Sequence, residues 1–175
     1  MPIPLTGLDH DFRTRLEATL AACLADGIEM IPYQGIRTPF EQGKLWRQSR
    51  SVAQVRSKIA ELHEKGAPFL AHCIESVGPQ HGPHVTNALP GLSWHQWGES
   101  MDCYWLRNGK AEWSTEIGGT RNGYKVYAHI AEQNGLFAGG HWQTFKDWPH
   151  VQKRKAGSPG MPLPEVDRVM QERFG

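Results

Sequence analysis

The sequence predicts an α+β fold, because segments with helical periodicity are mixed with short segments typical of strands. A chain of 175 residues with 39% hydrophobic and 21% charged residues suits one globular core. Apolar residues recur three or four positions apart in four segments: 12–24, 52–62, 124–131 and 165–174. Strand-like stretches occupy 28–33 and 100–106. These patterns indicate a mixed fold without defining its topology.

The first predicted helix has Asp9 or Asp11 available as a cap and Gly27 as a stop. Its apolar face consists of Phe12, Leu16, Leu20, Cys23 and Leu24. The stretch 28–33 follows, and Pro32 within it favours an edge strand.

Two capping boxes mark the next helices. Thr38-Pro39-Phe40-Glu41 predicts a helix that begins at Pro39, which fixes Arg37 at a strand-to-helix corner. A second box at 51–54 opens a helix that ends near Gly66. Its predicted apolar stripe is Val52, Val55, Ile59 and Leu62.

The remaining chain alternates loops with regular elements. We expect mostly loop over 66–90, with a short strand at 84–86. In the strand 100–106, alternation places Met101, Cys103 and Trp105 on one face and Asp102 and Tyr104 on the other. Asn134-Gly135 closes the helix at 124–131, and three prolines precede the terminal helix at 165–174.

Composition excludes several classes of protein. The net charge of +1 and the absence of a clustered basic stripe argue against a nucleic-acid partner. No apolar run is long enough to cross a bilayer, and the first residues do not resemble a secretory signal peptide. Cys23, Cys73 and Cys103 are odd in number and widely spaced, so we expect buried free thiols.

Two pairs of residues could share one metal ion. His95 precedes Asp102 by seven positions, and Asp147 precedes His150 by three. Catalytic zinc commonly takes three nitrogen or oxygen ligands from the protein, while a separate carboxylate handles protons. Spacing alone leaves metal binding open, because nine histidines provide many such pairs by chance.

Four blocks in order resemble the M15 family of zinc peptidases, and within it the phage endolysins and L-alanyl-D-glutamate peptidases. The blocks are Gly35-Ile36-Arg37-Thr38 with Gln42, the stretch 85–91, Ser93-x-His95-x6-Asp102, and Gly139-Gly140-His141-Trp142 followed by Asp147-x-x-His150. The resemblance runs from about Ile28 to Gln152.

The resemblance implies a role for each matched residue. One Zn²⁺ would be held by His95, Asp102 and His150, with Asp147 as general base. Arg37 would lie over the substrate and stabilise developing negative charge. Substrate binding is further implied for Gln42, Ser93 and Trp142, although Gln42 and Ser93 could equally be a solvent-facing helix residue and a turn residue.

The same resemblance implies a fold and an activity. The fold would be a small, mostly antiparallel sheet that carries the zinc ligands, as in Hedgehog and D,D-peptidase folds. We expect one catalytic domain over 1–155, with 156–175 forming a Pro-rich connector and an amphipathic helix packed on it. The implied reaction is hydrolysis of a peptidoglycan stem peptide at L-Ala–D-Glu, in which zinc activates water and Asp147 takes its proton.

Two departures from the family pattern bear on this expectation. Glu99-Ser100-Met101 stands where a small apolar pair is usual, so Glu99 adds a carboxylate, for which we expect a role behind the ligands or on the surface. Residues 50–84 are also longer than expected, which suggests a different substrate preference.

Three alternative functions stay open. The same chemistry could act near terminal D-Ala residues, as in a D,D-carboxypeptidase or D,D-dipeptidase. A zinc-stabilised wall-binding module without turnover is disfavoured by the presence of both Asp147 and Arg37. A metal-dependent nuclease is disfavoured by the charge balance.

The implied biological setting is bacteriolysis. Bacterial peptidoglycan is the expected partner, and we expect a monomer without stable membrane association. A phage lysis enzyme of this kind would reside in the host cytoplasm and reach the wall or periplasm once a separate protein permeabilises the membrane. A tail-borne or bacterial enzyme is the alternative.

Overall fold

The computed structural model describes residues 3–175, and residue contacts group them into two compact units. Unit 1 comprises the chain up to Ile36 together with Trp97–Lys155. Unit 2 comprises Arg37–Gln96 and Ala156–Gly175. The expectation of one catalytic domain over 1–155, with 156–175 packed on it, stays a prediction.

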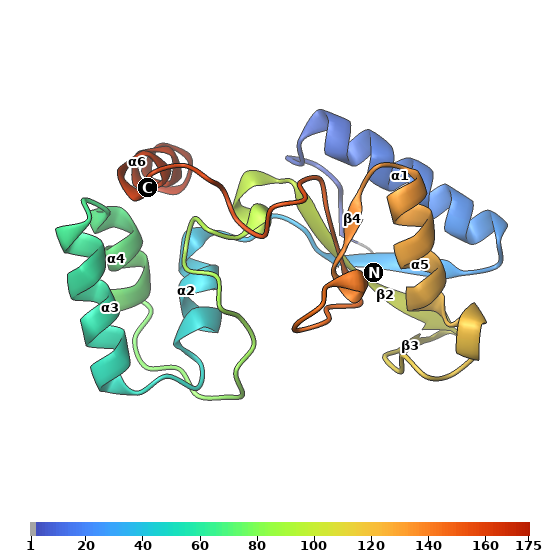
Figure 1. Cartoon of the computed structure of the whole chain (residues 1–175), viewed down its shortest axis with the longest axis horizontal. Helices are drawn as coiled ribbons and strands as arrows, with labels where there is room; N and C mark the ends of the chain where they lie inside the picture. Colours follow the sequence, from blue (N-terminus) through green and yellow to red (C-terminus); the bar gives the residue numbers. More distant parts are fainter. Residues whose placement is uncertain (1–2) are drawn as a thin grey trace. The chain divides into compact units, whose positions relative to one another are not determined.

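Unit 1 is built on a five-stranded sheet (Figure 1). Its strands are β1 (Glu29–Gln34), β2 (Ser100–Arg107), β3 (Lys110–Glu112), β4 (Phe137–Ala138) and β5 (His150–Gln152). They follow the order β1-β2-β5-β4, with β3 paired to β2, and every pairing is antiparallel. The expected α+β fold with a small antiparallel sheet is therefore confirmed, as is the edge position of the 28–33 strand.

The core of unit 1 lies between the sheet and two helices, α1 (His10–Ala25) and α5 (Gly123–Gln133), which pack against each other. As predicted, Met101, Cys103 and Trp105 of β2 point into this core. Alternation then leaves Asp102 and Tyr104 on the opposite face of the strand. The sheet thus separates an apolar face from a face that carries polar residues.

The first helix follows its prediction with one exception. The Asp9 side chain accepts a hydrogen bond from the backbone N–H of Phe12 at 2.9 Å, so Asp9 is the cap. Leu24 was expected on the apolar face but is 62% exposed. It lies in the last turn of α1, one residue before the helix ends.

Three strands were not predicted, for different reasons. The β2–β3 hairpin turns at Asn108-Gly109, both with positive φ (52° and 71°), as a two-residue turn of type I′ requires. That Asn-Gly pair was a usable signal in the sequence. Strands β4 and β5 have only two and three residues, too few to show alternation.

Unit 2 is helical and contains α2 (Pro39–Arg47), α3 (Val52–Glu64), α4 (Pro68–Glu75) and α6 (Leu163–Phe174). Both predicted capping boxes are present, at Thr38 and Ser51. Val55 and Leu62 are buried as expected, whereas Val52 in the first turn of α3 is 62% exposed. Short 3₁₀ helices occur across the chain at Trp94–Trp97, Gly119–Arg121 and Gly139–His141.

The expectation of mostly loop over 66–90 was wrong for Pro68–Glu75. This segment forms α4, which packs against α2, α3 and α6. The segment has only eight residues and begins without a side-chain cap, so it offers neither the longer periodic stretch nor the capping box that marked other helices. The strand expected at 84–86 does not form.

Helix α6 completes the N-terminus of α4. Ala67 precedes α4 and supplies no side-chain cap, whereas Asp167 of α6 accepts a hydrogen bond from the backbone N–H of Leu70 at 2.8 Å. Burial raises the pKa of the Asp167 carboxyl, and the helix N–H groups act in the opposite direction. A cap is therefore supplied from 97 residues away in the chain.

Two further expectations concern the whole described chain. Cys23, Cys73 and Cys103 are buried free thiols, as predicted, and burial raises the pKa of Cys23 and Cys73 to about 12. Within residues 3–175, no helix combines the length and apolar character that crossing a bilayer requires.

Candidate active site

Asp102 and His150 lie directly opposite each other on β2 and β5 of unit 1. His150 Nδ1 is 2.9 Å from Asp102 Oδ1, and both side chains are buried. Their pairing follows from the register of two antiparallel strands, in which facing residues bring their side chains together. Two residues separated by 48 positions in the sequence thus share one point on the sheet.

His95 lies on the 3₁₀ helix Trp94–Trp97, whose last residue already belongs to unit 1. His95, Asp102 and His150 are all buried, and each offers one ligand atom; these atoms lie within 4.8 Å of one another. In the described part of the chain, no other group of three His, Cys, Asp or Glu residues meets this condition.

The donor set fits a divalent cation. Two imidazoles and one carboxylate are the nitrogen and oxygen ligands typical of catalytic zinc, and three protein ligands leave a fourth position for water or substrate. Both ring nitrogens of His150 face oxygen atoms. Nδ1 lies 2.9 Å from Asp102 Oδ1, and Nε2 lies 3.0 Å from Gln152 Oε1. Without a cation the ring would need two protons to satisfy both oxygens.

The pKa of His150 also indicates that its surroundings favour a positive charge. Burial by itself lowers the pKa of His150, but the hydrogen bond and charge of Asp102, the charge of Asp147 and the bond to Gln152 outweigh it, and the pKa is raised. The groups around the ring therefore favour positive charge at this position, which either a proton or a metal ion can supply.

Asp147 is positioned by a glycine turn. Its backbone N–H donates to the carbonyl of Gly139 at 3.0 Å, and its own carbonyl accepts from His150 N–H at 3.2 Å. A Cβ on Gly139 would lie 2.5 Å from the Asp147 carbonyl oxygen, and one on Gly140 would overlap the Trp148 ring. The Gly-Gly pair therefore lets this turn pack against the Asp147–His150 segment.

Trp142 follows the same turn and packs beside a metal-ligand candidate. Its ring centroid lies 5.3 Å from that of His150, at an interplanar angle of 51°, and the side chain is half-buried. An aromatic wall next to His150 suits a role in binding substrate, which stays a prediction.

Arg37 and Gln42 are joined in unit 2. Arg37 lies just before α2, and its Nη1 donates to Gln42 Oε1 at 2.9 Å. The backbone N–H of Arg37 also donates to the carbonyl of His95 at 3.3 Å. Gln42 is fully buried, so it is not a solvent-facing helix residue; its amide group donates to the Ala88 carbonyl at 2.8 Å. Direct contact of Gln42 with substrate stays a prediction.

Ser93 makes local turn contacts around His95. Its backbone N–H donates to Gln96 Oε1 at 3.1 Å, and its hydroxyl oxygen accepts from His95 N–H at 3.5 Å. These bonds stabilise the short helix that carries His95, while a contact of Ser93 with substrate is untested.

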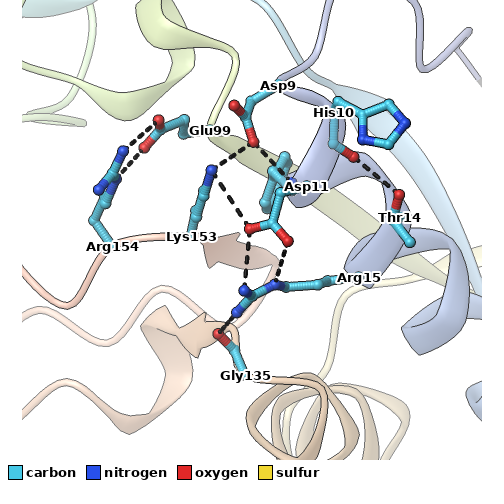
Figure 2. A network of polar contacts seen from close by, with 10 residues as sticks. Asp9, His10, Asp11, Thr14, Arg15, Glu99, Gly135, Lys153 and Arg154 are labelled. Atoms are coloured by element: carbon cyan, nitrogen blue, oxygen red, sulfur yellow. Dashed lines mark hydrogen bonds and ion pairs between the residues drawn. The ribbon is translucent and has the colours of Figure 1, made fainter.

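Glu99, just before β2, and Gln152, the last residue of β5, are two further buried polar residues of unit 1. The Glu99 carboxylate is buried and binds the guanidinium of Arg154 through two contacts of 2.6 and 3.0 Å (Figure 2). No sequence motif marks Gln152, although a residue two positions after His150 on a strand shares its face. Strand β5 has only three residues, so the sequence offers no pattern from which this shared face could be inferred.

Comparisons with known proteins identify the family. The family described as VanY, D-alanyl-D-alanine carboxypeptidase, matches residues 6–139, a span that includes His95 and Asp102 and ends before Asp147. The peptidoglycan L-alanyl-D-glutamate endopeptidase CwlK of Bacillus subtilis (strain 168) is 27% identical over 156 residues, which cover 87% of this chain and 76% of that protein.

Two solved structures are similar at lower identity. The L-Ala D-Glu endopeptidase ChiX of Serratia marcescens shares 17% identity, with a TM-score of 0.47 over 85% of this chain and 81% of that one. A mutant of the vancomycin resistance D,D-pentapeptidase VanY, in complex with Zn(II), shares 17% identity, with a TM-score of 0.48 over 97% and 88%. Since the family match spans more than half of the sequence, the chain is a peptidoglycan peptidase of the VanY family within the M15 metallopeptidases.

Proposed function

We propose that this chain is a zinc-dependent endopeptidase that hydrolyses the L-Ala–D-Glu bond of peptidoglycan stem peptides. The observation that carries the proposal is the buried group of His95, Asp102 and His150, whose ligand atoms lie within 4.8 Å of one another. One ion held by these three ligands retains an open coordination position for catalysis.

The choice of bond is supported by relatives rather than by geometry. CwlK, at 27% identity, is named for the L-alanyl-D-glutamate bond. The description of the matching family instead names D-alanyl-D-alanine carboxypeptidase, which makes cleavage near the terminal D-Ala residues the second candidate. Mass spectrometry of the fragments released from purified peptidoglycan separates the two, because only the first bond leaves L-Ala alone on the glycan.

The roles of the chain's own residues follow from their chemistry. When bound, zinc supplies Lewis acidity that lowers the pKa of water towards roughly 7. Asp147 takes the proton as water attacks the amide and returns it to the leaving amine. Arg37, held by Gln42, stabilises the negative charge that develops on the amide oxygen. Trp142 provides an aromatic wall for the substrate.

Two variants test the assignment of roles. Asp147→Asn should retain zinc and lose about 10²–10⁴-fold in the rate of hydrolysis, the usual contribution of a general acid–base group. His150→Ala should lose both zinc and activity. Zinc stoichiometry and fragment release are measured on each protein, with His129→Ala, an exposed histidine of α5, as control. An active Asp147→Asn protein would overturn the assignment of the base.

The bacteriolytic, phage-endolysin role that the sequence resemblance implies is part of this proposal. Purified protein added to cells with permeabilised outer membranes should then lower the turbidity of the suspension in a zinc-dependent manner. Fragment release from isolated peptidoglycan without any clearing of cells would restrict the proposal to the peptidase activity.

A further inference from the structure

Gln152 occupies a buried position beside the candidate ligand His150. It follows His150 by two residues on β5, so both side chains point to the same face of the sheet. Its side chain is only 2% exposed, and Ser100 of β2 lies opposite it. A buried amide must find partners for its polar atoms, so the contacts of Gln152 define its orientation.

The orientation of the Gln152 amide follows from the neighbouring backbone. Its NH₂ group donates to the carbonyl oxygen of Arg154, which can only accept. The amide oxygen Oε1 is therefore the atom that faces His150 Nε2, at 3.0 Å. An amide oxygen also only accepts, so Nε2 must carry the proton of this hydrogen bond.

The other nitrogen of His150, Nδ1, is then the one without a proton. Nδ1 lies 2.9 Å from Asp102 Oδ1, a carboxylate oxygen of the candidate metal centre. With its proton on Nε2, a neutral imidazole has its lone pair on Nδ1, and only a nitrogen with a lone pair can ligate a cation. The amide of Gln152 thus selects which nitrogen of His150 is available.

The segment that orients Gln152 is itself anchored by ion pairs (Figure 2). Arg154 binds the buried carboxylate of Glu99 through two contacts. The backbone N–H of Lys153 donates to the backbone carbonyl of Glu99 at 2.9 Å. Lys153 Nζ lies 2.7 Å from Asp9 Oδ1 and 3.4 Å from Asp11 Oδ2 of α1. These contacts hold the Arg154 carbonyl in place, and with it the Gln152 amide.

We propose that Gln152 is a positioning residue that keeps the proton of His150 on Nε2 and presents Nδ1 to the metal, with the Glu99–Arg154 pair anchoring it from behind. This inference rests on the proposed function, because it requires that the site bind a cation. It gives a role to Glu99, the carboxylate that departs from the family pattern, and to Gln152, which no sequence motif marked.

The first test measures zinc affinity with Gln152→Met, which preserves side-chain length and removes the acceptor. Competition titration against a chelator should show a loss of about 10–100-fold, the usual effect of removing a partner of a ligating histidine. Gln152→Glu restores an acceptor and should bind zinc more tightly than Gln152→Met. The matched control is Gln133→Met, since Gln133 contacts His129 at 3.0 Å on the exposed surface of α5; its affinity should be unchanged.

The second test reads the tautomer directly. Long-range ¹H–¹⁵N spectra of the zinc-loaded protein should show His150 with a protonated Nε2 and a metal-shifted Nδ1. In Gln152→Met, the preference for this tautomer should weaken while the fold, monitored by circular dichroism, is retained. A purely structural role for Gln152 would lower stability without changing the nitrogen that binds zinc.

The outcomes separate the inference from the proposed function. If wild-type protein binds zinc but His150 uses Nε2, or if Gln152→Met keeps wild-type affinity, the role of Gln152 is wrong and the proposed function stands. If wild-type protein binds no divalent cation, both fall.

Discussion

The two units of the molecule hold a functional side chain in the same way, through a buried glutamine. In unit 1, Gln152 accepts from His150 and donates to the carbonyl of Arg154. In unit 2, Gln42 accepts from Arg37 and donates to the carbonyl of Ala88. In each case a backbone carbonyl determines which end of the amide faces the functional group.

The two pairs differ in what the glutamine can control. Histidine has two nitrogens that exchange roles, so its partner decides which of them is available. Arginine stays protonated and has only donors, so its partner can fix position but not protonation. We therefore expect Gln152 to influence metal binding and Gln42 to influence only the placement of positive charge.

The largest expected effect is a loss of catalytic rate in the variant Gln42→Met. Releasing the Arg37 guanidinium by even about 1 Å can cost roughly 100-fold in rate, so we expect kcat/KM to fall by about 10–100-fold. Zinc affinity should stay at the wild-type value. Steady-state kinetics on a soluble stem peptide and chelator competition provide the two measurements, with Gln171→Met on the exposed face of α6 as control. A parallel loss of zinc affinity would break the distinction between the two glutamines.

A smaller effect concerns the stability of unit 2. Asp167→Ala removes the acceptor that α6 offers to the Leu70 N–H at the start of α4, which should lower the free energy of unfolding by about 1–2 kcal/mol. Asp167→Asn keeps an oxygen acceptor and avoids the cost of burying a charge, so it should lose less. Urea denaturation measures both variants. Equal losses for Ala and Asn would show that packing, rather than the cap, is responsible.

The smallest effect is the acid dependence of the ion pairs in unit 1. The hydrogen bond from Lys153, followed by that from Phe12 N–H, lowers the pKa of Asp9. A lowered folded-state pKa contributes stability above the unfolded value near 4, and this contribution is lost as the pH falls through the folded pKa. Asp9→Asn keeps the helix cap and removes the charge, so it should cost under about 1 kcal/mol at pH 7.

Urea denaturation at pH 7 and at pH 3 checks this expectation. The difference between wild type and Asp9→Asn should be smaller at the lower pH, because the contribution decreases as the pH falls from the unfolded pKa towards the folded one. A difference that does not change with pH would show that the charge of Asp9 is not what stabilises the protein.

Local signals in the sequence predicted much of the fold. Capping boxes depend on residues three positions apart, so Thr38 and Ser51 marked two helix starts correctly. Alternation in 100–106 correctly assigned Met101, Cys103 and Trp105 to the core. Helix α4 was missed because its eight residues are too few for a clear periodic pattern and no capping box marks its start.

In the candidate site, too, the sequence identified the residues and the tertiary structure decided how they meet. Residue types, spacing and family resemblance named His95, Asp102 and His150 from the sequence, because ligand chemistry requires imidazole and carboxylate groups. The pairing of β2 with β5 decided that Asp102 and His150 face each other, and a three-residue strand gives no periodic signal of its own. Only the tertiary structure placed Gln152 against His150 and Glu99 against Arg154, because hydrogen bonds between strand neighbours depend on register and side-chain orientation, which local sequence does not encode.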